Sequence, residues 1–304
     1  MLRYKVAVNM KIFLTGASGY VGNYILRDLV KAGYEVNCLI RKGSEKKLRM
    51  KGKKIKIFYG DITDSAAVAK AMKGCKAVIN LVAIRREHRK QTFENVIFGG
   101  TKNCVDAAKK HGIKRFIQMS VLGAKRNAET KFWQAKWEAE EYVRKSDLTY
   151  TIFRPSFIFS KEDISINEFA RLIKKFPVFP IFGDGEYKSQ PVYVEDVSAA
   201  FAKAIKLRDV ENGIFEVGGP KKYTFNELIA TLETLVNKKV VKLNVLLWIA
   251  YPIVSLIQFL PNAPITMGEL KMLTRDNVCN EKKFAEIFKI KLTPLEKKFK
   301  GYHK

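Results

Sequence analysis

The chain has 304 residues, of which 47% are apolar, and can therefore bury a substantial core in one large domain, with or without a smaller lobe. This composition excludes a collagen-like chain, low-complexity disorder and a small disulfide-bonded protein. Basic residues outnumber acidic ones by 56 to 30, a formal charge of +26, and residues 1–150 hold 32 of the basic and 13 of the acidic side chains. Phosphorylated ligands, anionic lipid and nucleic acid are the partners that such a charge attracts.

The four cysteines and three histidines predict neither disulfides nor a metal site, because they are scattered and contain no Cys-x-x-Cys pair. The N-terminus does not resemble a secretory signal, since its apolar run carries Arg3, Lys5 and Lys11 and leads directly into a glycine motif. Met10 is an alternative start to Met1, because the fold is expected to begin at Lys11. We expect a cytoplasmic protein.

Apolar runs and helical spacing alternate along the first half of the chain. A run at Lys11–Leu14, a helical pattern at Tyr20–Ala32 and a run at Glu35–Ile40 make a βαβ unit. Further strands are expected at Ile55–Tyr59, Ala77–Leu81, Arg115–Met119, Thr149–Phe153 and Gly213–Val217, and helices at Ser65–Met72, Thr92–His111 and Ala128–Lys145. The alternation predicts an α/β fold, a Rossmann-type doubly wound parallel sheet.

The regular alternation ends after Phe153, and the remaining segments predict a smaller, mostly helical lobe for a substrate or partner. We expect a dinucleotide-binding domain of residues 10–154 plus about 186–218, and a lobe of about 155–185 plus 219–304. Residues 245–260 carry no charge, but a membrane-spanning helix needs about twenty residues and Pro252 is expected to break this one. A buried helix pair is the first expectation for this segment, and docking on lipid or on a membrane protein is the alternative.

The segment Thr15–Gly22 carries a phosphate-binding pattern. Gly16, Gly19 and Gly22 follow a strand and open a helix, so the backbone can approach a pyrophosphate and the helix N-terminus can attract it. Ser18, Tyr20 and Val21 complete this turn. The sequence context therefore predicts a dinucleotide site.

The end of the second strand indicates which dinucleotide is bound. NAD-preferring sites place a carboxylate there, whereas this chain has Arg41 and Lys42, and a guanidinium suits a 2′-phosphate. NADP(H) is therefore favoured over NAD(H), although Arg41 also lies in a generally basic stretch. After the third strand Asp61 and Ile62 are expected beside the adenine, and after the fourth Val82 and Ala83 are expected over the cofactor.

Several segments in order along the chain resemble one family, the atypical extended short-chain dehydrogenase/reductases. In particular they are similar to the NAD(P)H-binding accessory subunit of respiratory complex I and its bacterial relatives. The segments are Thr15–Gly22, Gly60–Asp61, Glu94–Thr101, Arg154–Ser156, Pro191–Asp196, Glu216–Pro220, Leu260–Thr266 and Thr274–Val278. The resemblance implies a Rossmann fold, an epimerase- or dehydratase-like architecture, a cofactor contact at Pro155 and a respiratory-complex partner.

The resemblance also exposes a departure at the catalytic position. Active members use a Tyr with a Lys four residues later, which lowers the pKa of the phenol, and a Ser that holds the substrate carbonyl. Here Phe132 stands at the Tyr position, Lys136 is present, and Ser120 matches the Ser position. Lys136 is expected to bind the cofactor ribose, or else to act alone as acid and base. Ser120 is equally well explained as a turn residue.

Three functions are compatible with these residues. Phe132 favours a cofactor-holding accessory or redox-sensing protein with weak or no turnover. The Rossmann features with Lys136 and Ser120 favour an active NAD(P)H-dependent reductase or a sugar-nucleotide epimerase or dehydratase. An RNA-binding family member has the weakest support, because the basic stretches contain few interleaved aromatic residues. Peripheral attachment to the inner face of an anionic membrane fits the charge.

Overall fold

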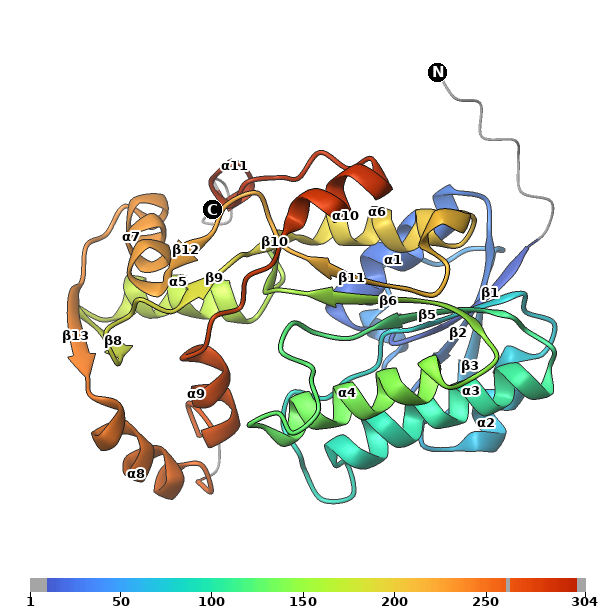
Figure 1. Ribbon diagram of the computed structural model, residues 1–304, viewed down its shortest axis with the longest axis horizontal. Helices are drawn as coiled ribbons and strands as arrows, with labels where there is room; N and C mark the ends of the chain where they lie inside the picture. The colour runs from blue at the N-terminus through green and yellow to red at the C-terminus, as the bar shows by residue number, and fades with distance from the viewer. Residues whose placement is uncertain (1–9, 261–262, 300–304) are drawn as a thin grey trace.

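The computed structural model describes residues 10–260 and 263–299; the expectation about Met1 concerns residues outside these ranges. Its larger domain is a seven-stranded, fully parallel sheet in the order β11-β6-β5-β4-β1-β2-β3 (Figure 1). The strands are β1 (Lys11–Thr15), β2 (Glu35–Ile40), β3 (Ile55–Tyr59), β4 (Ala77–Asn80), β5 (Arg115–Met119), β6 (Thr149–Pro155) and β11 (Gly213–Val217). The predicted Rossmann-type fold is confirmed.

Helices cover both faces of this sheet, because alternate side chains of its strands are apolar on both sides. In β1, Ile12 and Leu14 enter one core and Phe13 enters the other. The first core lies under α1 (Tyr20–Lys31), α6 (Val194–Ala204) and α10 (Glu281–Phe288), and the second under α2 (Ser65–Met72), α3 (Gly100–Lys110) and α4 (Lys131–Arg144). Short helical turns occur at Glu45–Lys47, Glu94–Gly99 and Arg208–Val210.

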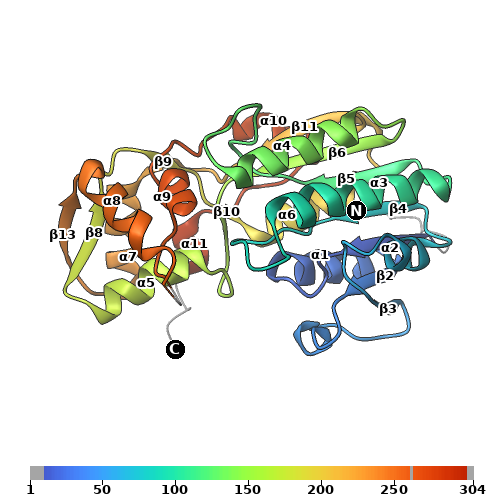
Figure 2. The same ribbon diagram turned by 90° about the horizontal axis from the view of Figure 1, so that it is seen from below.

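A second lobe lies beside the carboxyl ends of the strands (Figures 1 and 2). Its core joins Phe159, Ile173 and Leu228. Its helices are α5 (Ser165–Lys175), α7 (Phe225–Val236), α8 (Leu247–Ile257), α9 (Met267–Leu273) and α11 (Leu295–Phe299). Its paired strands are β7 (Ile158–Phe159) with β10 (Val192–Tyr193), β9 (Lys188–Ser189) with β12 (Tyr223–Thr224), and β8 (Val178–Phe182) with β13 (Val241–Val245).

Two expectations about the C-terminal part differ from the structure. Helix α10 packs on the large sheet, with the Phe288 ring 5.2 Å from that of Phe153. The sequence instead predicts that this helix belongs to the lobe, with the rest of about 219–304. Helix α8 runs through Pro252 without a break. It is also largely exposed rather than part of a buried pair, since only Ala250 and Val254 of its residues are fully buried. Within the described ranges, no helix combines the length and hydropathy needed to cross a bilayer.

Candidate functional site

The glycine turn after β1 has the geometry of a phosphate cradle. Gly16 adopts φ +73°, a left-handed conformation that favours glycine. A Cβ on Gly22 would lie 2.0 Å from the Gly16 carbonyl oxygen, so helix α1 can approach the turn only without a side chain there. The amide N–H of Gly19 donates to the same oxygen at 2.9 Å. The first and third glycines are thus required by the backbone itself.

The N-terminus of α1 is available to an anion. Its N-cap is Gly19, no described side chain caps it, and its first turn contains no acidic residue. The free N–H groups and the positive end of the helix dipole therefore suit a pyrophosphate. The side chains of Tyr20 and Val21 pack with the lobe core, so these two residues can offer only their backbone to such a ligand.

A groove of about 190 Å³ begins at this turn and crosses the carboxyl ends of β1, β2, β3 and β4. Eight of the residues expected to bind the cofactor line it: Gly16, Ser18, Gly19, Arg41, Asp61, Ile62, Val82 and Ala83. The other expected residues, Tyr20, Val21, Gly22, Lys42, Lys136 and Pro155, are not part of its lining. Thr15, Leu39, Gly60 and Ile84, at or just after the same strand ends, also line the groove, and Gln91 joins them from the loop after β4.

The two charged side chains of the groove, Arg41 and Asp61, differ in the contacts that they make within the protein. The Arg41 Nη1 atom donates to Gln91 Oε1 at 3.3 Å, and no described carboxylate forms a salt bridge with Arg41. Asp61 is held by its own turn, where Oδ1 accepts from the Thr63 amide at 3.0 Å and from its hydroxyl at 2.9 Å. Arg41 therefore remains able to bind an anionic ligand, whereas Asp61 serves partly to fix the loop.

Beneath the groove a buried polar network fixes the strand ends. Asn80 Oδ1 accepts from the Thr15 hydroxyl at 2.6 Å, and Asn80 Nδ2 donates to Thr101 Oγ1 and Gln118 Oε1 at 3.0 Å each. Buried polar groups are costly unless paired, so this network holds β1, β4, β5 and α3 in one relative position. Thr101 ends one of the segments that carry the family resemblance, Glu94–Thr101, whereas Gln118 has no local motif in the sequence.

Lys136 and Ser120 lie together at the end of β5. The Lys136 side chain is buried and donates to the Met119 carbonyl oxygen at 3.0 Å. Burial lowers the pKa of Lys136 to about 8, although Glu140 raises it. The buried Ser120 hydroxyl has no hydrogen-bond partner among the described residues. An orphaned hydroxyl beside a buried amine is the kind of polar pair that a ligand completes.

Phe132 occupies an apolar cluster rather than a polar one. Its ring lies 5.5 Å from that of Phe93, edge to face, and both pack against Ile97. About two turns further along α4, buried Glu140 accepts from Arg154 Nε at 2.9 Å and thereby ties α4 to β6. The position where active relatives need a proton donor is therefore filled by a hydrocarbon ring.

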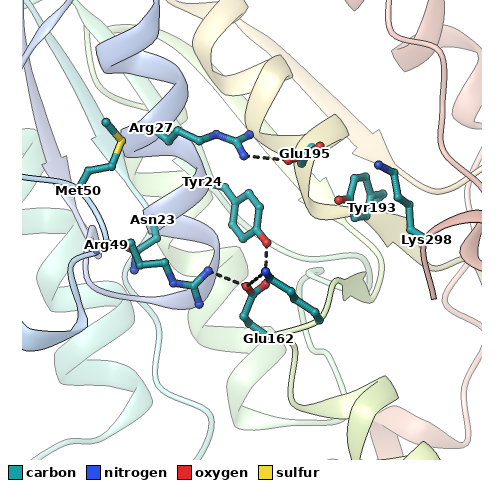
Figure 3. A pocket seen from close by; sticks show the side chains of 10 residues that line it. Asn23, Tyr24, Arg27, Arg49, Met50, Glu162, Tyr193, Glu195 and Lys298 are labelled. Atoms are coloured by element: carbon teal, nitrogen blue, oxygen red, sulfur yellow. Dashed lines mark hydrogen bonds and ion pairs between the residues drawn. The ribbon is translucent and has the colours of Figure 1, made fainter. Parts of the chain in front are cut away.

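A larger cavity of about 400 Å³ lies elsewhere, between α1, the loop before α5 and the start of α6 (Figure 3). It shares no lining residue with the groove. Arg27 of α1 reaches Glu195 at 2.8 Å, and Arg49 and the Tyr24 hydroxyl contact Glu162 at 2.8 and 2.6 Å. The pair of Arg49 with Glu162 joins the sheet domain to the loop before α5, so the cavity lies at the junction of the sheet domain and the lobe; Lys161 and Lys298 give its lining an excess of basic side chains.

Similarity to known proteins agrees with this geometry. A protein family described as NAD(P)H-binding matches this chain over residues 16–177. The chain belongs to that family. The chain is also 32% identical over 230 residues to subunit 9 of the NADH dehydrogenase [ubiquinone] 1 alpha subcomplex of Arabidopsis thaliana mitochondria. Together the matches support the predicted membership of the atypical extended short-chain dehydrogenase/reductases. The match to the Arabidopsis thaliana protein covers 73% of the chain and 57% of that relative. The Rattus norvegicus protein of the same name is 32% identical, and that match covers 70% of this chain and 58% of the relative.

The chain thus spans less than three fifths of the length of these relatives. Among solved structures, an NADPH-dependent quinone oxidoreductase from Escherichia coli, determined with NADPH, superposes with a TM-score of 0.77. It shares 21% identity and covers 95% of this chain and 98% of its own. At that identity the likeness establishes the fold alone.

Proposed function

We propose that the protein binds NADP(H) in preference to NAD(H), in the groove at the carboxyl ends of β1 to β4. Arg41 supports this choice, because it lines the groove at the end of β2 without a carboxylate partner. A guanidinium there can form charge-assisted hydrogen bonds with a 2′-phosphate. Gly16, Gly19 and the α1 N-terminus would hold the pyrophosphate, and Lys136 the nicotinamide-side ribose.

The proposed role is that of a cofactor-holding accessory or redox-sensing protein with weak or no tyrosine-dependent turnover. The observation that carries it is Phe132, which packs with Phe93 where relatives need a proton donor. When bound, the dinucleotide supplies hydride chemistry, but a hydrocarbon ring cannot supply the accompanying proton. The relatives named as NADH dehydrogenase subunits support a respiratory-complex partner. The proposed location is the cytoplasm, on the inner face of a membrane, where the formal charge of +26 would be attracted to anionic lipid.

Titration of the protein with NADPH and with NADH tests the cofactor choice. We expect NADPH to bind more tightly than NADH. The substitution Arg41→Asp should weaken the binding of NADPH, but not that of NADH, by about 1–3 kcal/mol, which is roughly 5- to 150-fold in Kd. Lys46→Asp makes the same charge reversal at an exposed position outside the groove and should leave the preference unchanged. Equal affinities in the parent protein would refute the proposal.

A second function, an active reductase or epimerase, is favoured by one observation. The buried Lys136 amine, with its pKa lowered to about 8 by burial, is poised for proton transfer near neutral pH beside the unpartnered Ser120 hydroxyl. This alternative predicts robust carbonyl turnover by the natural sequence, lost in Lys136→Ala while NADPH binding persists. Absence of turnover with cofactor bound supports the accessory role instead.

A further inference from the structure

Helix α8 presents its apolar side to solvent. Trp248, Leu256 and Phe259, the last just beyond the helix, are 71%, 76% and 84% exposed, and Ile249, Ile253 and Leu260 are exposed with them. The positions recur with helical spacing and therefore form one face, here called the α8 face. Figure 1 shows α8 on the rim of the lobe, apart from the seven-stranded sheet.

The opposite side of this helix is buried and is also mainly apolar. Ala250 and Val254 are the side chains that pack against Leu270 of α9. Gln258 points inward, since its Oε1 atom accepts from the amide of Met267 at 3.2 Å. A surface helix normally buries its large apolar residues and exposes its polar ones. Because α8 is apolar on its exposed side as well as on its buried side, the exposed face indicates a surface that another surface covers.

The two-stranded ribbon before α8 extends the same exposed surface. In the parallel register of β8 and β13, Val178 is paired with Val241 and Pro180 with Leu243, and all four are exposed. Further along the ribbon, Phe182 and Val245 pack with the α8 cluster. Contiguous exposed apolar patches of this kind mark interaction sites in soluble proteins.

Positive charge borders this uncharged surface. No charged residue occurs between Lys242 and Glu269 in the sequence. Lys174, Lys175 and Lys239 are exposed beside the ribbon, where Asp184 only partly offsets them. At the other border the single carboxylate of Glu269 is shared by Arg85 and Arg86, at 2.7 and 2.6 Å, which leaves one positive charge in excess.

We propose that the α8 face and the adjoining ribbon dock on the surface of an anionic lipid bilayer. Lipid is favoured over a protein partner because the face lacks any charge to pair, while lysines and arginines stand at its borders and Trp248 suits the headgroup region. The eleven-residue helix is too short to span the bilayer and would lie in its surface. The overall charge of +26 adds attraction to anionic headgroups.

Vesicle flotation tests this proposal without reference to cofactor binding. Phosphatidylcholine vesicles with and without phosphatidylglycerol are compared at about 0.05 M and about 0.5 M KCl, which changes the screening length severalfold. The full chain should float with the phosphatidylglycerol vesicles at low salt and less at high salt. A blue shift of emission, absent in Trp248→Phe, should accompany binding, because Trp248 is exposed, whereas Trp133 is buried and Trp137 is half-buried on α4 of the sheet domain.

The variant Leu256→Asp/Phe259→Asp should weaken flotation at least about tenfold, because each buried apolar side chain contributes more than 1.4 kcal/mol. Ile164→Asp alters an exposed apolar residue at the start of α5 and should bind as the parent does. Circular dichroism verifies that each variant is folded. Failure of the folded parent to bind anionic vesicles overturns the proposal. Binding only to membranes that retain their proteins also overturns it and assigns the face to a protein partner.

Discussion

The protonation of Lys136 links the stability of the protein to its chemistry. Burial lowers the folded-state pKa to about 8 from 10.5, against the charge of Glu140, which raises it. Below pH 8 both folded and unfolded chains carry the proton, and the folded chain bears the full cost of the buried charge. As pH rises from 8 towards 10.5 the unfolded chain binds more protons, so the free energy of unfolding increases. Between pH 7 and pH 9.5 the titration of Lys136 therefore raises the free energy of unfolding by about 2 kcal/mol.

Urea denaturation across this pH range measures the effect in the parent protein and in Lys136→Met. Other groups also titrate in this range, so the informative quantity is the free energy of unfolding of the parent minus that of Lys136→Met. This difference should increase by about 2 kcal/mol as pH rises. Lys131→Met, on an exposed residue of the same helix, is the matched control and should show no such change. A parent-minus-variant difference that stays constant with pH would contradict the reasoning.

Three further substitutions test the site. Gly22→Ala should destabilise the protein by about 2 kcal/mol in urea denaturation and weaken NADPH binding, since its Cβ would meet the Gly16 carbonyl oxygen. Asn80→Ala should cost about 1–3 kcal/mol of unfolding free energy by removing the donor to the buried Gln118 Oε1 atom and the acceptor of the Thr15 hydroxyl, and a cost below about 0.5 kcal/mol would contradict the network. Phe132→Tyr should raise NADPH-dependent carbonyl reduction, by up to roughly 10²-fold, in steady-state assays; an unchanged rate would show that more than this side chain is missing.

The central sheet was predictable because both of its faces are covered. Strands buried on both sides appear in the sequence as short, continuous apolar runs, which turn residues separate from the helical patterns. β2, β3, β5 and β11 have the predicted bounds, whereas β4 ends one residue earlier and β6 two residues later. Since the carboxyl ends of parallel strands meet at one edge, the positions of Gly16, Arg41 and Asp61 at the ends of β1, β2 and β3 sufficed to predict a common groove.

Long-range polar contacts were not predictable in the same way. Arg86 meets Glu269 across 183 residues of sequence, and Asn80 meets Gln118 across 38. No periodicity or motif encodes such pairs, because each side chain alone fits a solvated loop or a strand end equally well. Arg85 and Arg86, in the loop after β4, likewise turn to Glu269 of α9 and join the groove wall to the lobe.

The α8 segment shows why hydropathy alone could not distinguish a buried helix from an exposed one. An uncharged run of residues fits a core and fits an interaction surface, and the expected buried helix pair requires a further layer of protein above Trp248 and Leu256. The described lobe has none: α9 contacts the side of α8 that carries Ala250 and Val254, and those small side chains allow the two helices to approach closely. Leaving side chains as large as those of Trp248 and Leu256 in water is the opposite of what stability in water favours. The arrangement is therefore better explained by an external apolar surface than by folding of the lobe itself.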